Sequence, residues 1–212
     1  MEVDISQENE EPFNTQVTTT NLDLASSLEA LNFLGSESLR DADQIDGTLE
    51  LKVDFAGSLQ DLKLITGKNK GVIDFELHDL KLKGLNVLDR ISKKLFSPGL
   101  FSELSFAPLI NVLQINGSRL EIPQMEVQTD EVDFFMEGHL DNNNNTNIWL
   151  SIPLDNIKRK NKASLEPRDY EDTKRKFYFE LKPDEKGKLQ SKFRFRKKKF
   201  YTQRGLDWKE NK

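Results

Sequence analysis

The side chains best suited to metal chemistry in this sequence are two histidines, His78 and His139. A zinc site needs three or four ligands, and cysteine and histidine supply most of them. The chain contains no cysteine, and neither histidine has a second one nearby in the sequence. We therefore expect no metal site, no disulfide and no thiol nucleophile. Both histidines are interpreted as solvated residues of strands.

Carboxylates are the next candidates for catalysis, and they cluster in the segment DEVD at residues 130–133. A glycosidase needs two opposed carboxyl groups whose pKa values differ. Here the acidic residues alternate with apolar ones, which is typical of the solvent-facing side of a strand. The sequence also lacks a Walker loop, a G-x-G-x-x-G motif and a G-x-S-x-G motif. We predict that the protein is not an enzyme and takes no cofactor.

A third kind of chemistry, the binding of anions, is indicated by the basic stretch KFRFRKKKF at residues 192–200. Aromatic and cationic side chains in such a stretch could stack bases and hold phosphates. However, Phe193 and Phe195 lie at odd positions, and the cations of residues 192–196 lie at the even positions around them, as in an amphipathic edge strand. This pattern favours an anionic lipid surface over nucleic acid. The expected contacts to an anionic surface are Lys192, Arg194, Arg196, Lys197, Lys198 and Lys199.

The distribution of charge along the chain supports a separate role for this end. Residues 1–152 hold 11 Lys/Arg and 26 Asp/Glu, a balance of −15, whereas residues 153–212 hold 20 and 10, a balance of +10. The two balances sum to the net charge of −5. A basic end can bind an anionic surface, and it can equally be a solvated tail that keeps the chain soluble.

The elements that must position these residues are mostly strands. Segments with alternating apolar residues recur at 47–57, 71–84, 115–138, 148–154, 176–183 and 189–196. In the segment 71–84 the apolar residues change from odd to even positions near His78–Asp79, which indicates a β-bulge. Leucines at three-to-four spacing predict short amphipathic helices near 22–34 and 85–97, with Asn21 as the cap of the first.

The fold class follows from this pattern and from the composition. Apolar residues make up 36% of the chain and charged residues 32%, which favours antiparallel sheets with one solvated face. We predict a mainly β (α+β) fold, a curved, mostly antiparallel sheet of about seven to nine strands with two short amphipathic helices. The expected organisation is a flexible acidic arm at 1–20, a β domain at 21–155, and a charged linker with a basic β-hairpin and tail at 156–212.

The segment RLEIPQMEVQTDEVDFFMEG, residues 119–138, shows how the sheet could offer an apolar surface. Its apolar residues lie at even positions before Pro123-Gln124 and at odd positions directly after it. One extra residue there can form a bulge that returns the side chains to the same face. QTDE then turns the chain. These residues could line a lipid groove or form a closed core beneath the helices. The residues expected there are Leu120, Ile122, Met125, Val127, Val132, Phe134, Met136, Ile148 and Leu150.

Two stretches of this chain, residues 47–92 and 113–155, resemble the C-terminal region of AsmA-like proteins. The resemblance spans about residues 20–160 and consists of a G-x-I-D phrase, an N-G turn followed by a P-x-M phrase, and an F-x-x-x-G phrase with a following Asp. The matching positions are Gly71, Ile73, Asp74, Asn116, Gly117, Leu120, Ile122, Pro123, Met125, Phe134, Gly138, Leu140 and Asp141.

The resemblance implies a bacterial envelope protein, periplasmic and associated with the inner membrane, whose apolar β-groove takes part in outer-membrane assembly and phospholipid transport. Its expected partners are phospholipid or a membrane surface, and other envelope proteins. The sequence shows no signal peptide and no run of about 20 apolar residues, so an anchor is expected outside this chain. The alternative is a structural module that docks a partner protein through a sheet edge or its basic tail.

Overall fold

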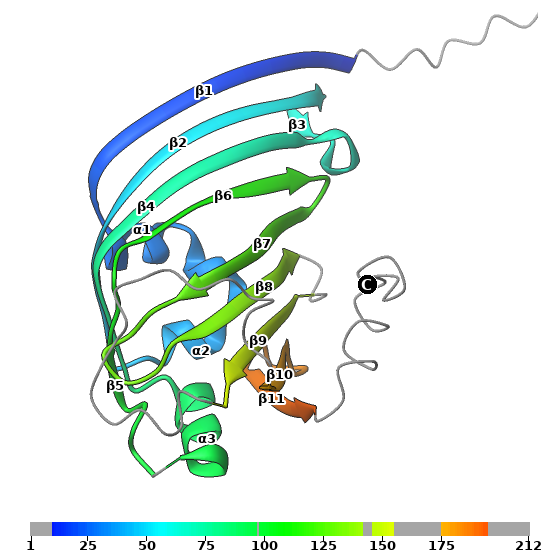
Figure 1. Ribbon diagram of the computed structural model, residues 1–212. Helices are drawn as coiled ribbons and strands as arrows, with labels where there is room; N and C mark the ends of the chain where they lie inside the picture. The colour runs from blue at the N-terminus through cyan, green and yellow to red at the C-terminus, as the bar shows by residue number, and fades with distance from the viewer. Residues whose placement is uncertain (1–9, 97, 142–145, 155–174, 195–212) are drawn as a thin grey trace, which may run out of the picture.

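The protein is described here by a computed structural model that covers residues 10–96, 98–141, 146–154 and 175–194. These residues form one 11-stranded sheet, in which each pair of neighbouring strands is antiparallel. The sheet is open and strongly curved (Figure 1). Its main path runs in the order β1 (Glu10–Asp23), β2 (Gln44–Gln60), β4 (Lys70–Lys83), β6 (Leu109–Asn116), β7 (Arg119–Val127), β8 (Phe134–Asp141), β9 (Asn147–Pro153), β10 (Lys176–Pro183) and β11 (Leu189–Arg194); β3 (Lys63–Leu64) pairs with β2, and β5 (Glu103–Ser105) pairs with β4.

The helices lie within the curve of the sheet, on its concave face (Figure 1). They are α1 (Leu24–Ala30), α2 (Glu37–Arg40) and α3 (Asn86–Leu95). The short 3-10 turn η1 (Asn32–Gly35) lies between α1 and α2, and η2 (Thr66–Lys68) lies between β3 and β4. The first helix begins at Asp23, whose carboxylate accepts a hydrogen bond from the Ser26 N–H at 2.8 Å. The prediction of Asn21 as the cap is wrong, because Asn21 lies two residues before Asp23, with a φ of 57°, beside a break in the β1–β2 register.

Two bulges expected from the sequence are confirmed. Between β2 and β4, Asp46 pairs with Lys81 and Thr48 with His78, so β4 carries an extra residue at this point. Asp79, inside the bulge, has a φ of 53°. The second bulge lies in β7, between Ile122 and Met125, as the parity of the apolar residues predicts. Because bulges bend a strand and increase its twist, they help to curve the sheet around its apolar face.

The main core lies between α3 and the C-terminal half of the sheet. Val87, Leu88 and Ile91 project from one side of α3 and are at most 8% exposed. They pack in one cluster with strand residues such as Phe134 and Phe179. The three-to-four spacing of the apolar residues in α3 places them on a single face, and this explains why a ten-residue helix is stable here.

The N-terminal segment differs from its prediction. Residues 1–20 are expected to be a loosely held arm, but the described part, residues 10–20, belongs to strand β1, which pairs with β2 from Glu10 to Asp23. The run of Thr and Val residues in this segment has a strong preference for strands. It shows little alternation because most of its side chains are exposed on both faces, as expected for an edge strand.

Three further differences concern the count of elements. The sequence beyond Pro98-Gly99 predicts a second short helix or a loop at residues 100–106, yet this segment contains β5. With β1 and β3, this raises the strands from the expected seven to nine to 11. The helix near 22–34 is divided into α1 and η1 and is followed by α2, whereas α3 agrees with the helix near 85–97. Of the predicted C-terminal region, only residues 175–194 lie within the described structure, and they form the expected hairpin.

Candidate functional site

The concave face of the sheet holds an apolar cavity of about 550 Å³, which we call the concave cavity. Its walls are mainly the inward side chains of β4, β6, β7, β8, β9 and β10, with Ile45 of β2 and Leu189 of β11. Residues of α1, α2 and α3 contribute to its border. Among the described residues that line it, Asp141 alone has a charged side chain. Many of the lining residues are half-buried, including Phe75, Leu113, Leu120 and Met136. The cavity is therefore reachable from solvent and presents aliphatic and aromatic carbon.

Eight of the nine residues predicted for a groove or core line this cavity; Val132 does not. Val132 precedes β8, in a turn where its N–H donates to Thr129 Oγ1 at 2.9 Å, and its side chain is buried in the main core. The prediction that it belongs to the strand is wrong because this turn, which includes the predicted QTDE segment, extends to residue 133. The other eight meet on the concave face because strand pairing aligns Leu120 with Leu140 and Met125 with Met136.

The concave face is closed in one part and open in another. Near α3, Val127, Phe134 and Leu150 are 2–6% exposed and belong to the main core. A second, smaller core, the α1 cluster, consists of Leu24, Ile45 and Leu80. Toward the other end of the strands, some cavity-lining residues remain half-buried and belong to neither the main core nor the α1 cluster: Phe75, Leu113, Leu120 and Leu140. The helices thus cover one part of the apolar face and leave another part as a cavity.

The polar atoms at the border of the concave cavity are engaged with one another. The Asp141 carboxylate accepts hydrogen bonds from Ser118 Oγ at 3.2 Å and from Arg119 Nε at 3.3 Å. The Asp141 N–H donates to Thr146 Oγ1 at 3.1 Å. A site of this composition can exclude water from a hydrocarbon ligand, and its contacts are non-directional.

Several cavity residues were missed by the sequence reasoning. Phe75 and Leu77 of β4, and Leu109 and Leu113 of β6, lie in the rows that continue Leu120 and Ile122 across the sheet. The sequence did contain a signal for them, because in each strand these residues lie at the alternating positions that form its apolar face. What the sequence could not supply was the order β4-β6-β7, which places these rows beside one another.

The prediction of one apolar face per strand is wrong for β8, β9 and β10. On the face opposite the helices, Phe135, Trp149 and Tyr178 are 2–5% exposed, so these strands are buried on both sides. Glu137, Ser151 and Glu180 on the same face are also buried. A signal was present here as well: each strand contains three consecutive apolar residues, and continuous apolar runs are typical of strands buried on both faces.

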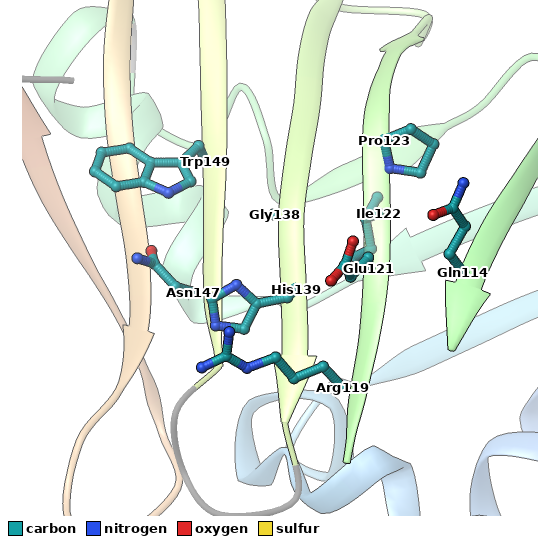
Figure 2. Close-up of a pocket in the computed structure, with 9 residues that line it drawn as sticks. All are labelled: Gln114, Arg119, Glu121, Ile122, Pro123, Gly138, His139, Asn147 and Trp149. Atoms are coloured by element: carbon teal, nitrogen blue, oxygen red, sulfur yellow. The ribbon is translucent and has the colours of Figure 1, made fainter. Parts of the chain in front are cut away.

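A smaller and more polar cleft of about 350 Å³ lies beside these strands (Figure 2). It is lined by Arg119, Glu121, His139, Asn147 and Trp149, among others, from β7, β8 and β9. Glu121 and His139 are cross-strand partners. The described residues contain no group of three or more His, Cys, Asp and Glu side chains placed to hold a metal ion. The other histidine, His78, lies 3.4 Å from Glu76 on half-exposed β4.

The predicted anion-binding residues are only partly within the described structure. Lys192 is exposed, whereas Arg194 donates to Glu180 at 2.8 Å and its side chain is 18% exposed. Lys182 lies 2.7 Å from the other oxygen of Glu180. Burial opposes the ionisation of Glu180, but the hydrogen bonds from Lys182 and Arg194 outweigh it and hold the pKa of Glu180 below its ordinary value. Arg194 is thus used within the hairpin, and Arg196 to Lys199 lie outside the described residues.

The described helices are all too short or too polar to cross a bilayer. Comparison of the chain with protein-family models, with curated proteins and with solved structures gave no match. The assignment of a function therefore rests on the geometry of the concave face and on the motifs quoted above.

Proposed function

We propose that this protein is a non-enzymatic lipid-handling module that shelters the acyl chains of a phospholipid in its concave cavity. The observation that carries the proposal is the cavity itself: about 550 Å³ of space, reachable from solvent, with one charged side chain in its lining. Small-molecule pockets typically have volumes of about 300–1,000 Å³. Folded proteins rarely leave a contiguous apolar surface uncovered, and such surfaces often mark binding sites.

The energetics of acyl binding suit a cavity without directed polar groups. Burial of each methylene group contributes about 0.8 kcal/mol. About ten buried methylenes would contribute about 8 kcal/mol, close to the binding free energy of a micromolar complex. The loss of translational freedom reduces this value. A longer or second acyl chain would compensate, so diacyl lipids are the ligand class that this surface favours.

The resemblance to AsmA-like proteins supports a place in the bacterial envelope, in the periplasm and near the inner membrane. Several residues of the quoted motifs have a backbone role in the structure. Gly117 forms the β6–β7 turn with a φ of 64°, Pro123 lies in the β7 bulge, and Gly138 has a φ of 143° opposite that bulge. On this proposal the protein contributes to outer-membrane assembly and to phospholipid movement between the two membranes.

The direct test is native mass spectrometry of the full chain purified from cells without detergent. We expect a phospholipid adduct that extraction with organic solvent removes and that added phospholipid restores. A water-soluble glycerophosphodiester with the same headgroup and no acyl chains is the matched control, and it should not bind. The proposal fails if folded protein reproducibly carries no lipid and takes none up, or if the headgroup compound binds as well as the lipid.

A further inference from the structure

The N-terminal edge of the described sheet is long, and no other described strand covers it. Strand β1 spans 14 residues and, among the described strands, pairs only with β2. Between Pro12 and Leu22 it contains no charged residue. Proteins normally protect an exposed edge with charges, proline, a bulge or a short strand, because free N–H and C=O groups there can pair with another chain. On β1 such features occur only at the ends, where Pro12 and the register break after Thr19 enclose the segment Phe13–Thr19.

Strand β1 is regularly paired with its neighbour along this edge. The pairing of β1 with β2 is continuous from Glu10 to Thr19. Phe13 packs against Phe55 with ring centroids 5.8 Å apart, and Lys68 donates to Glu10 at 2.7 Å. Because this pairing already fixes the backbone of β1, the strand loses little conformational entropy when another strand is added to it. The opposite edge of the described sheet, β11, has six residues and carries Lys192 and Arg194, so self-pairing there would bring like charges together.

We propose that β1 is an interface for a second copy of this chain, which pairs with it antiparallel about a two-fold axis normal to the sheet. The uncharged segment Phe13–Thr19 is centred on Gln16, so Gln16 would face its own counterpart and Phe13 would face Thr19 of the other copy. No like charges meet along this contact. The side chains of Phe13, Thr15, Val17 and Thr19 have the parity that lies beside the concave-face residues of β2. This register therefore keeps the concave faces of both copies on the same side.

The size of the contact sets the expected strength. Seven residues extend for about 23 Å along the edge. An interface made of one strand pair is at the small end of specific protein interfaces, so we expect a reversible dimer. Its consequence for lipid handling, a single sheet with two concave cavities in line, rests on the proposed function. The dimer itself does not, and its test requires no lipid.

Cysteine cross-linking of the full chain tests the register, because the natural sequence has no cysteine. Asn14, Gln16 and Thr18 are exposed on one face of β1, so replacement should leave the fold intact. Under mild oxidation we expect Gln16→Cys to form a covalent dimer. Asn14→Cys and Thr18→Cys should each fail alone, since their counterparts lie about 13 Å away, but an equal mixture of the two should cross-link. Cross-linking of Asn14→Cys alone to the same extent as Gln16→Cys overturns the register.

Charge substitution tests the association itself. Sedimentation velocity over a range of concentrations should show a monomer–dimer equilibrium for the unaltered chain. Gln16→Lys and Gln16→Glu should each weaken the dimer about tenfold or more, because like charges then meet at the axis, and mixing the two should restore it. The proposal is overturned if the unaltered chain is a monomer at every concentration, including the case in which it captures a strand of a different protein. It is also overturned if Gln16→Lys dimerises as strongly as the unaltered chain.

Discussion

Replacement of Leu120 by glutamate should damage lipid binding without unfolding the protein. Leu120 lies in β7 opposite Leu140, lines the concave cavity, is half-buried and belongs to neither the main core nor the α1 cluster. A carboxylate at this position would project into the cavity and retain its hydration shell. Because the site is reachable from solvent, the charge costs the empty protein little.

The loss of affinity can be estimated from the geometry of the sheet. A carboxylate excludes an acyl chain from about one residue spacing along the strand, ~3.4 Å, or about three methylenes. At about 0.8 kcal/mol for each methylene, the loss is about 2.4 kcal/mol, which corresponds to about 60-fold weaker binding. The same substitution at Ile110 is the matched control, because Ile110 lies on the neighbouring strand β6, is 64% exposed and does not line the cavity.

The assay is a fluorescence titration with a phospholipid whose acyl chain carries an environment-sensitive dye, with displacement by unlabelled phospholipid. Circular dichroism and thermal unfolding establish that both variants are folded. We expect Leu120→Glu to raise the dissociation constant about 60-fold and Ile110→Glu to leave it within about twofold. Equal affinities for the unaltered chain and Leu120→Glu, or equal losses in the two variants, would refute the location of the ligand in the concave cavity.

Three further predictions concern stability. Ile91→Ala should lower the free energy of unfolding by about 2–5 kcal/mol, because the side chain is 0% exposed beneath α3; chemical denaturation measures this, and exposed Lys94→Ala should cost less than about 0.5 kcal/mol. Gly138→Ala should cost about 2–4 kcal/mol, since φ is 143° and the new Cβ would lie 2.2 Å from the Asn147 carbonyl oxygen, whereas Gly67→Ala, with no atom within 4 Å, should be tolerated. The pKa of Glu180 is held below its ordinary value of 4.5. The ionised carboxylate therefore stabilises the fold above that pH, and this stabilisation is lost as the pH falls through the folded-state pKa. Between pH 6 and pH 3 the melting temperature should drop less in Glu180→Gln than in the unaltered chain, and equal drops would contradict this.

Much of the local structure could be predicted because the physical cause is itself local. The parity change at Pro123-Gln124 locates the β7 bulge, since successive side chains in a strand point to opposite faces. The Asn116-Gly117 pair indicates a tight turn, and the structure joins β6 to β7 there through Gly117 and Ser118. The spacing of apolar residues in α3 predicts its buried face for the same kind of reason.

Other features depend on neighbours that are distant in the sequence. Residues 10–20 have no clear period, and they become a strand because β2 offers an edge along which their backbone can pair. Trp149 and Tyr178 lie on the face expected to be solvated, but they form a buried cluster because β9 and β10 are adjacent. Burial on a second face is a property of the packed sheet, and no single strand carries it.

The amino-acid sequence by itself determined the apolar face, its bulges and the helices that could cover it, because these follow from periodicity and backbone chemistry. It also supplied the nine residues placed on that face, eight of which line the concave cavity. Only the tertiary structure decided which part of the face is closed. Strand order and helix position place α3 over Phe134 and Leu150 and leave Leu113 and Leu120 half-buried, and periodicity carries no information about what lies opposite a side chain.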